Sequence, residues 1–224
     1  MSAAKTQAFV LKTQDYRDTS LLAHFYTRDY GKLHGIIKGI RDARGRFGST
    51  LEPFSLNEIL VYIRRRGGDL HPVTGVELLD SFPAVREDLE RVSYASYFVD
   101  LLNELVEAEE PNPAIFDLLG ESLVFLSSGA SPKRVARVFE AKLLGHLGLM
   151  PEADDIPRAA GVSISKGTLN FLEHVRRAEV KDLYAVKVSQ EVGEELQSFL
   201  RRFVDHHLHN KLRSMVFLEK MGLN

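Results

Sequence analysis

The sequence of 224 residues contains no cysteine. This absence excludes disulfide bonds, a cysteine nucleophile and any metal site built on thiolates. Residues 1–5 do not lead into an apolar run of signal-peptide length, and no segment approaches the ~20 apolar residues of a membrane span. We therefore expect a cytoplasmic protein that makes no contact with membrane.

The signatures of common enzymes are also missing. The sequence has neither a G-x-x-x-x-G-K-[ST] phosphate loop nor a G-x-S-x-G nucleophile elbow. Asp205-His206-His207-Leu208-His209 resembles a metal site or a phosphoesterase motif, because Asp205 and His209 would share one face of a helix. Phosphoesterases of that kind need further carboxylate motifs upstream, and these are absent. We predict no catalysis, no metal and no cofactor, and keep a metal-dependent phosphoesterase that uses Asp205, His206 and His209 as an alternative.

The small net charge of −2 conceals local clusters of positive charge. Residues 1–80 hold 12 Lys and Arg against 9 Asp and Glu, whereas residues 81–224 hold 17 against 22. In the first part the cations form two groups, Lys38, Arg41, Arg44 and Arg46, and then Arg64, Arg65 and Arg66. A strand over residues 56–63 would hold the groups on the order of 25 Å apart, at ~3.3 Å per residue. Such a separation fits a track for several nucleotides, while the other interpretation is a pair of solvated loops.

Five short apolar runs rich in Val, Ile, Leu, Phe and Tyr predict strands in the first part of the chain. They cover residues 6–13, 21–26, 33–38, 56–63 and 70–78, with turn residues between them. No helix long enough for a crossover separates them, so we predict a five-stranded antiparallel barrel of the oligonucleotide-binding (OB) type. Tyr26, Tyr30, Phe47 and Tyr62 could offer stacking faces, although most aromatic residues at such spacing belong to the core.

The pattern changes to helical spacing near residue 80. Ser81-Phe82-Pro83, Asn112-Pro113 and Ser131-Pro132 predict helix starts, each followed by an apolar stripe, and Ser189 is expected to cap a last long helix. The predicted fold class is α+β, with an OB domain at 1–80 and an all-α domain at 81–224. An irregular loop is expected near 150–167.

A third group of cations opens the helix that begins after Ser131. Lys133, Arg134 and Arg137 occupy its first turns, where positive charge is unfavourable because of the helix dipole. This local cost indicates that the three side chains bind something, and the apolar stripe beside them suits an acidic, hydrophobic peptide end. An exposed basic turn without a ligand is the other interpretation.

Several segments, taken in order, resemble the bacterial recombination mediator family RecO. They are Ala8-Phe9-Val10-Leu11, residues 16–21 (YRDTSL), Gly31-Lys32, Lys38-Gly39, residues 51–54 (LEPF), residues 137–148 (RVFEAKLLGHLG) and residues 212–218 (LRSMVFL). Many family members carry a four-cysteine zinc site after the central helix. The corresponding region here has no cysteine, so this chain resembles a member without that zinc site.

The resemblance implies an OB fold joined to a helical domain, and a role in DNA repair and recombination. It implies binding to single- and double-stranded DNA, annealing of complementary strands, and help in loading RecA onto strands covered by single-strand-binding protein. The implied partners are RecR and the acidic C-terminal tail of that single-strand-binding protein, with a nucleoid-associated location in the cytoplasm. An adaptor whose barrel does not bind DNA is the alternative.

These implications lead to two hypotheses about site residues. DNA is expected to contact the two basic groups of the barrel and, as a lesser candidate, Arg17; the full set is Lys38, Arg41, Arg44, Arg46, Arg64, Arg65, Arg66 and Arg17. The acidic tail peptide is expected to contact Lys133, Arg134 and Arg137.

Overall fold

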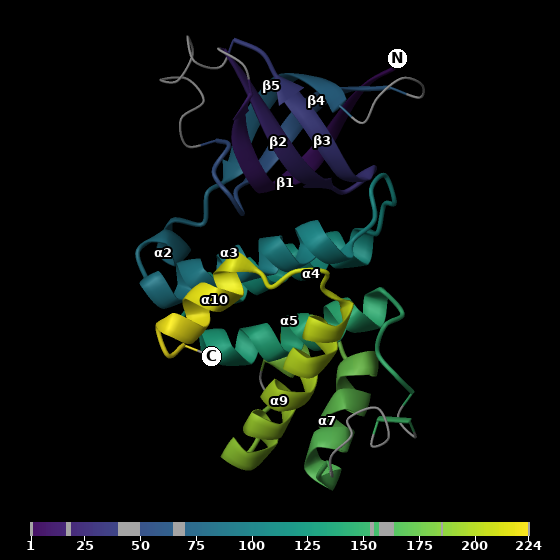
Figure 1. Cartoon of the computed structure of the whole chain (residues 1–224), viewed down its shortest axis with the longest axis vertical. Helices are drawn as coiled ribbons and strands as arrows, with labels where there is room; N and C mark the ends of the chain where they lie inside the picture. The colour runs from purple at the N-terminus through teal and green to yellow at the C-terminus, as the bar shows by residue number, and fades with distance from the viewer. Residues whose placement is uncertain are drawn as a thin grey trace. The chain divides into compact units, whose positions relative to one another are not determined.

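A computed structural model of the chain describes residues 2–16, 19–39, 50–64, 70–152, 155–156, 164–184 and 186–223 (Figure 1). The chain forms two compact units, Met1–Phe116 and Asp117–Asn224. The first unit includes the barrel together with the helices α2 (Pro83–Arg86) and α3 (Leu89–Leu105). The last strand ends at Asp80, where the sequence predicts the change from strands to helices. The division into domains at 1–80 and 81–224 stays a prediction.

Five strands form the N-terminal barrel. They are β1 (Ser2–Tyr16), β2 (Ser20–Thr27), β3 (Gly31–Ile37), β4 (Leu56–Ile63) and β5 (Leu70–Asp80). The barrel closes in the order β1-β2-β3-β5-β4, with antiparallel pairs throughout except for the parallel pair β3–β5. Inward-facing apolar residues such as Val10, Phe25, Ile59 and Val61 fill its interior. The predicted strands and the predicted α+β class with an OB barrel are confirmed, whereas the prediction that all strands pair antiparallel was wrong for β3 and β5.

Helix α3 is attached to the barrel through polar contacts at its C-terminal end. Lys32 Nζ donates to the carbonyl oxygen of Asn103 at 2.7 Å, which satisfies one of the carbonyl groups that the last helical turn leaves unpaired. His24 Nδ1 lies 2.8 Å from Asn103 Oδ1. Burial lowers the pKa of Lys32, while Glu104 and Glu107 act in the opposite direction. The half-buried ammonium group of Lys32 therefore binds the C-terminal end of α3 and fixes this helix to the barrel.

Aromatic side chains complete the packing of the first unit. The rings of Phe9 and Phe116 lie 4.8 Å apart between their centroids, and Tyr26 packs beside Phe116 at 6.5 Å. The Tyr26 hydroxyl donates to the carbonyl oxygen of Asn112 at 3.3 Å, and burial raises the pKa of Tyr26 to about 12. Tyr26 is therefore a core residue and offers no stacking face to a ligand.

The remaining helices are α4 (Pro113–Ser127), α5 (Pro132–His146), α7 (Lys166–Arg177), α8 (Val180–Leu183), α9 (Gln190–His207) and α10 (Arg213–Lys220). The starts at Pro113 and Pro132 are as predicted, and Ser189 caps α9 by accepting a hydrogen bond from the Val192 backbone N–H at 3.3 Å. The stripe after Pro83 predicted one continuous helix, and this was wrong. Asp88 interrupts it, because its carboxylate accepts from the Arg91 backbone N–H at 2.9 Å and starts α3 anew.

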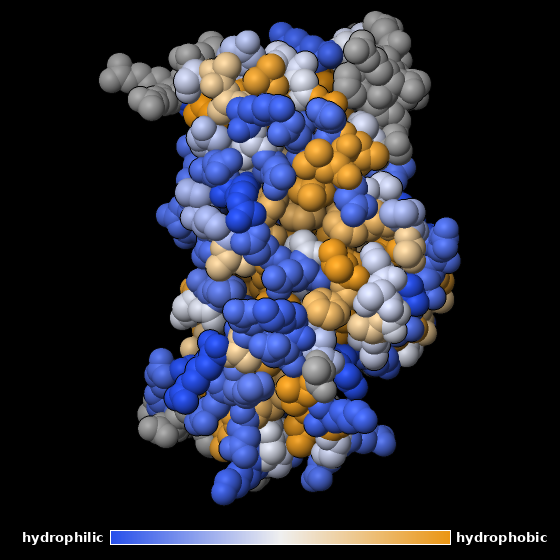
Figure 2. All heavy atoms as spheres, turned by 180° about the vertical axis from the view of Figure 1, so that it is seen from behind, coloured by the Kyte–Doolittle hydropathy of each residue, from blue (hydrophilic) through white to orange (hydrophobic). Residues whose placement is uncertain are grey.

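The loop expected near 150–167 lies largely outside the described residues, which include only 150–152, 155–156 and 164–167 of it. Within the described parts of the chain, no helix is both long enough and apolar enough to cross a membrane. On the face shown in Figure 2, most side chains are hydrophilic and the hydrophobic ones gather in small groups.

Gly31, the first residue of β3, sits where the chain crosses closely over the segment after α3. Its φ is +64°, and a Cβ atom placed on it would lie 2.8 Å from the Glu110 backbone nitrogen and closer still to the Glu110 carbonyl. Gly39 has a similar φ of +70°, but among the described residues nothing lies within 4 Å of a Cβ placed on it. Gly31→Ala therefore combines backbone strain with a clash against backbone, whereas Gly39→Ala adds the strain alone.

We expect Gly31→Ala to lower the free energy of unfolding by several kcal/mol and Gly39→Ala by about 1–2 kcal/mol. Urea unfolding, followed by circular dichroism, measures both. Equal losses in the two variants would mean that the approach of Glu110 contributes nothing.

Candidate functional site

Two of the eight residues predicted to contact DNA lie within the described structure. Lys38 is exposed and directly follows β3, and Arg64 is half-buried and directly follows β4. The remaining six, Arg17, Arg41, Arg44, Arg46, Arg65 and Arg66, lie outside the described residues.

The sheet register sets the distance between Lys38 and Arg64. Ile37 pairs with Val73, and Val73 pairs with Val61, so these three residues lie at one level across three strands. Lys38 is one residue beyond that level and Arg64 is three residues beyond it in the other direction. At ~3.3 Å per residue and ~4.8 Å per strand, the two are roughly 16 Å apart. The separation of on the order of 25 Å between the two basic groups stays a prediction, because most of both groups lies outside the described residues.

Arg64, directly after β4, is held by a buried histidine. The Arg64 backbone N–H donates to His71 Nδ1 at 3.2 Å, and His71 Nε2 lies 3.2 Å from Glu109 Oε1. Since Nδ1 accepts, the proton of the neutral ring is on Nε2, which points to the carboxylate. The side-chain Nε of Arg64 is buried without a hydrogen-bond partner within the described structure. This position therefore has a fixed backbone and an unsatisfied donor.

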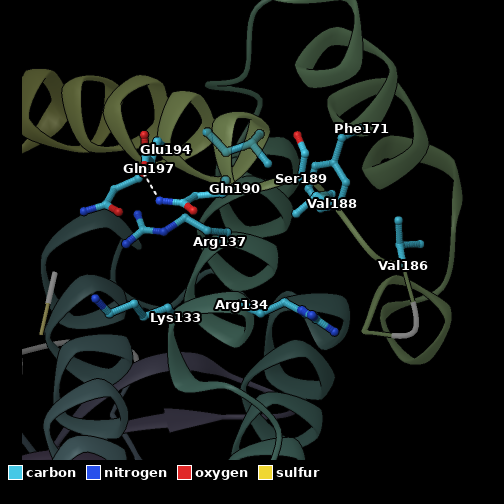
Figure 3. Close-up of a pocket in the computed structure, with 12 residues that line it drawn as sticks. Lys133, Arg134, Arg137, Phe171, Val186, Val188, Ser189, Gln190, Glu194 and Gln197 are labelled. Carbon is cyan, nitrogen blue, oxygen red and sulfur yellow. Dashed lines mark hydrogen bonds between the residues drawn. The ribbon is translucent and has the colours of Figure 1, made fainter.

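The second unit contains a pocket of about 450 Å³ between α5, α7 and α9 (Figure 3). Lys133, Arg134 and Arg137, the three cations predicted to act together, line its α5 side. Glu194 and Gln190 of α9 line another side and are joined by a hydrogen bond of 2.9 Å. Apolar side chains complete the lining: Phe171, Val186, Val188 and Leu196.

The two arginines of this pocket are oriented by buried groups. Arg137 Nη1 lies 2.7 Å from Glu140 Oε2, and the side chains are 13% and 2% exposed. Arg134 Nη1 donates to the carbonyl oxygen of Tyr184 at 3.2 Å. Tyr184 is fixed in turn, because its hydroxyl lies 3.2 Å from Ser122 Oγ, and burial raises the pKa of Tyr184. The guanidinium groups are thus held in place before any ligand arrives.

One carboxylate joins the two helices that frame the pocket. Glu195 of α9 accepts hydrogen bonds from the Ser165 backbone N–H at 3.0 Å, from Ser165 Oγ at 2.7 Å and from Thr168 Oγ1 at 2.5 Å. Ser165 is also the N-cap of α7. Hydrogen bonds from Thr168 and Ser165 lower the pKa of Glu195, since they favour the charged carboxylate.

The lowered pKa predicts an acid-sensitive contribution to stability. A carboxyl group whose pKa is depressed on folding stabilises the fold above its unfolded pKa of roughly 4.3, and this contribution is lost as pH falls through the folded value. We expect Glu195→Gln to unfold at lower urea concentration than the parent at pH 7, and the difference to shrink as the pH falls below about 4. A difference that is constant from pH 7 to pH 3 would contradict this assignment.

The Asp205–His209 group does not form the predicted helical face. Helix α9 ends at His207, and Leu208 adopts extended φ and ψ angles of −86° and 131°. His209 therefore leaves the helix, while Asp205 pairs with Arg201 at 3.2 Å. Across the described residues, no group of three or more His, Cys, Asp or Glu is placed to hold a metal ion. The geometry on which the phosphoesterase alternative depended was wrong.

Comparison with protein families matches both parts of the chain. The family model for the recombination protein O N terminal covers residues 1–82, and the one for its C terminal covers residues 86–157 and 155–215. The chain belongs to the RecO family.

Curated relatives align along nearly the full length of this RecO-family chain. The DNA repair protein RecO of Syntrophus aciditrophicus is 31% identical over 98% of this chain and 97% of its own length. That of Anaeromyxobacter dehalogenans strain 2CP-1 is 30% identical, with coverage of 99% and 98%. That of Halalkalibacterium halodurans is 31% identical, with coverage of 87% and 76%.

Proposed function

We propose that this protein is a DNA-binding recombination mediator in DNA repair. It anneals complementary single strands and helps to load RecA onto strands coated by single-strand-binding protein. Its curated relatives are named DNA repair proteins, and its N-terminal barrel has the OB strand order, which is common among proteins that bind nucleic acid. The proposed partners also include RecR and double-stranded DNA.

Annealing makes and breaks no covalent bond, so it needs no catalytic groups. Two phosphate backbones repel each other, and lysine and arginine side chains that screen this repulsion let bases search for their partners. Lys38 and Arg64 support the proposal because the register places these two cations roughly 16 Å apart, on either side of the level that Ile37, Val73 and Val61 share. We propose the other six cations of the set as further DNA contacts.

The observation that carries the partner proposal is the pocket of the second unit. Lys133, Arg134 and Arg137 line it together with Phe171 and Val188, so that positive and apolar groups face one space. Such a lining is complementary to a peptide that combines carboxylates with apolar side chains. We propose that the acidic C-terminal tail of single-strand-binding protein binds here, which would bring the barrel to DNA that this protein already covers.

Changing Arg64, Arg65 and Arg66 together to Glu tests the DNA proposal. We expect at least a tenfold loss of affinity for fluorescein-labelled single-stranded DNA, equal for all sequences, because phosphate contacts carry no sequence information. Each single-strand phosphate contact contributes ~0.7 to the slope of log affinity against log salt, so the slope should fall by about 2. Fluorescence anisotropy across a salt series measures both values.

The control is Lys220→Glu, a single change at an exposed cation on α10. Wild-type protein that binds DNA weakly and without salt dependence would favour the alternative function, an adaptor whose barrel does not bind DNA. An unaffected triple variant would remove this turn from the DNA site.

Lys133→Glu tests the peptide proposal. We expect at least a tenfold weaker affinity for a fluorescein-labelled peptide of the acidic tail, because the change replaces an attraction by a repulsion at the pocket wall. Lys220→Glu again serves as the control of equal charge change, and thermal unfolding checks that both variants fold. Equal affinities in the two variants would place the peptide elsewhere.

A further inference from the structure

A second recess lies on the helical unit at the C-terminal part of α9. Its volume is about 400 Å³, and it is lined by Leu149, Arg202, Phe203, His206 and His207. We propose that this recess binds an unstacked nucleobase of single-stranded DNA, with Arg202 meeting an adjacent phosphate. The inference rests on the proposed DNA-binding function and adds a contact on a part of the chain for which no DNA contact was predicted.

Flat rings dominate the wall of the recess. The centroids of Phe199 and Phe203 are 4.7 Å apart, and Phe203 and His207 are 6.3 Å apart with their planes inclined by 28°. These three residues are spaced four apart, so their rings follow one another along one face of α9. Phe199 is only 3% exposed and anchors this row in the core. A base can extend such a row, because every base has a π-face and stacking tolerates any sequence.

One hydrogen bond fixes the orientation of the outer imidazole. His207 Nδ1 lies 2.8 Å from the carbonyl oxygen of Phe203, which can only accept, so Nδ1 carries a proton. In the neutral ring the remaining nitrogen, Nε2, is an acceptor, and an amino or imino group of a base can donate to it. His206 stands edge-on to His207, with an angle of 88° between the rings. The recess therefore combines a stacking surface with hydrogen-bonding groups at its edge.

The surrounding charges are compatible with a phosphate. Asp205 and Glu219 are both bound by Arg201, and Glu219 also pairs with Lys211 at 2.6 Å. The negative charge of these two carboxylates is therefore compensated within the protein. The exposed Arg202 lines the recess next to the rings, and a guanidinium beside an aromatic row is the arrangement that single-strand-binding surfaces use. The volume is also in the range of ordinary small-ligand sites, about 300–1,000 Å³.

The experiment uses the full-length protein and two probes, a fluorescein-labelled 20-mer of thymidylate and a 20-mer of abasic sites with the same phosphates. Phe203→Leu removes the ring while it keeps an apolar side chain. Its control is Phe217→Leu, the same change at a ring on α10 that is 41% exposed. We expect Phe203→Leu to weaken thymidylate binding about fivefold or more, as loss of one stacked base would, and to leave abasic binding unchanged. Phe217→Leu should change neither.

Crosslinking supplies a second measurement that does not depend on the folding of a variant. An oligonucleotide with 5-iodouracil should crosslink on irradiation to the α9 peptide that contains Phe203 and His207, as mapped by mass spectrometry. The recess is not a base site if DNA binds, Phe203→Leu leaves the preference for thymidylate over abasic DNA unchanged, and no crosslink maps to the α9 peptide. Loss of acidic-tail peptide binding in Phe203→Leu, with DNA binding intact, would assign the recess to a protein ligand. Wild-type protein that binds no single-stranded DNA would refute the proposed function itself.

Discussion

The parallel pairing of β3 with β5 is the constraint on which the N-terminal unit depends. Only residues His34–Ile37 and Leu70–Val73 take part in this pairing. It nevertheless closes the barrel, because it joins β3 to β5 while antiparallel pairs join the other neighbouring strands. Closure removes the exposed sheet edges that would otherwise pair with other chains. It also fixes the levels of β3 and β4 relative to each other, and so decides that Lys38 and Arg64 lie near one another.

Much of the architecture could be predicted from the sequence because local rules determine it. Apolar runs bounded by turn residues defined all five strands, and Pro113, Pro132 and Ser189 marked helix starts through their own backbone preferences. The sequence did not indicate that a second helix begins after Asp88. An aspartate between apolar residues is equally typical of the exposed face of a continuous helix and of an N-cap. Helix α7 was missed although Ser165 caps it, because the cap is completed by Glu195, 30 positions away.

The candidate sites show the same division between local and long-range information. Lys133, Arg134 and Arg137 were found together because three cations in the first turns of one helix oppose its dipole. Their surroundings were not predictable, since Glu140 and Tyr184 orient the arginines through contacts made only on folding. For the Asp205–His209 group the error was of the opposite kind. Sequence spacing implies a shared face only while a helix continues, and α9 ends at His207.

Helix α9 lines both of the sites proposed for the second unit. Its first half lines the cationic pocket through Gln190 and Glu194, and its last turns line the recess of Phe203 and His207. At 1.5 Å per residue, the 13 residues from Gln190 to Phe203 span roughly 20 Å. A tail peptide of a few residues and a single base can therefore occupy opposite ends of this helix at the same time. The mediator role proposed above requires both contacts at once, because such a protein has to hold the covering protein and the strand that is being uncovered together.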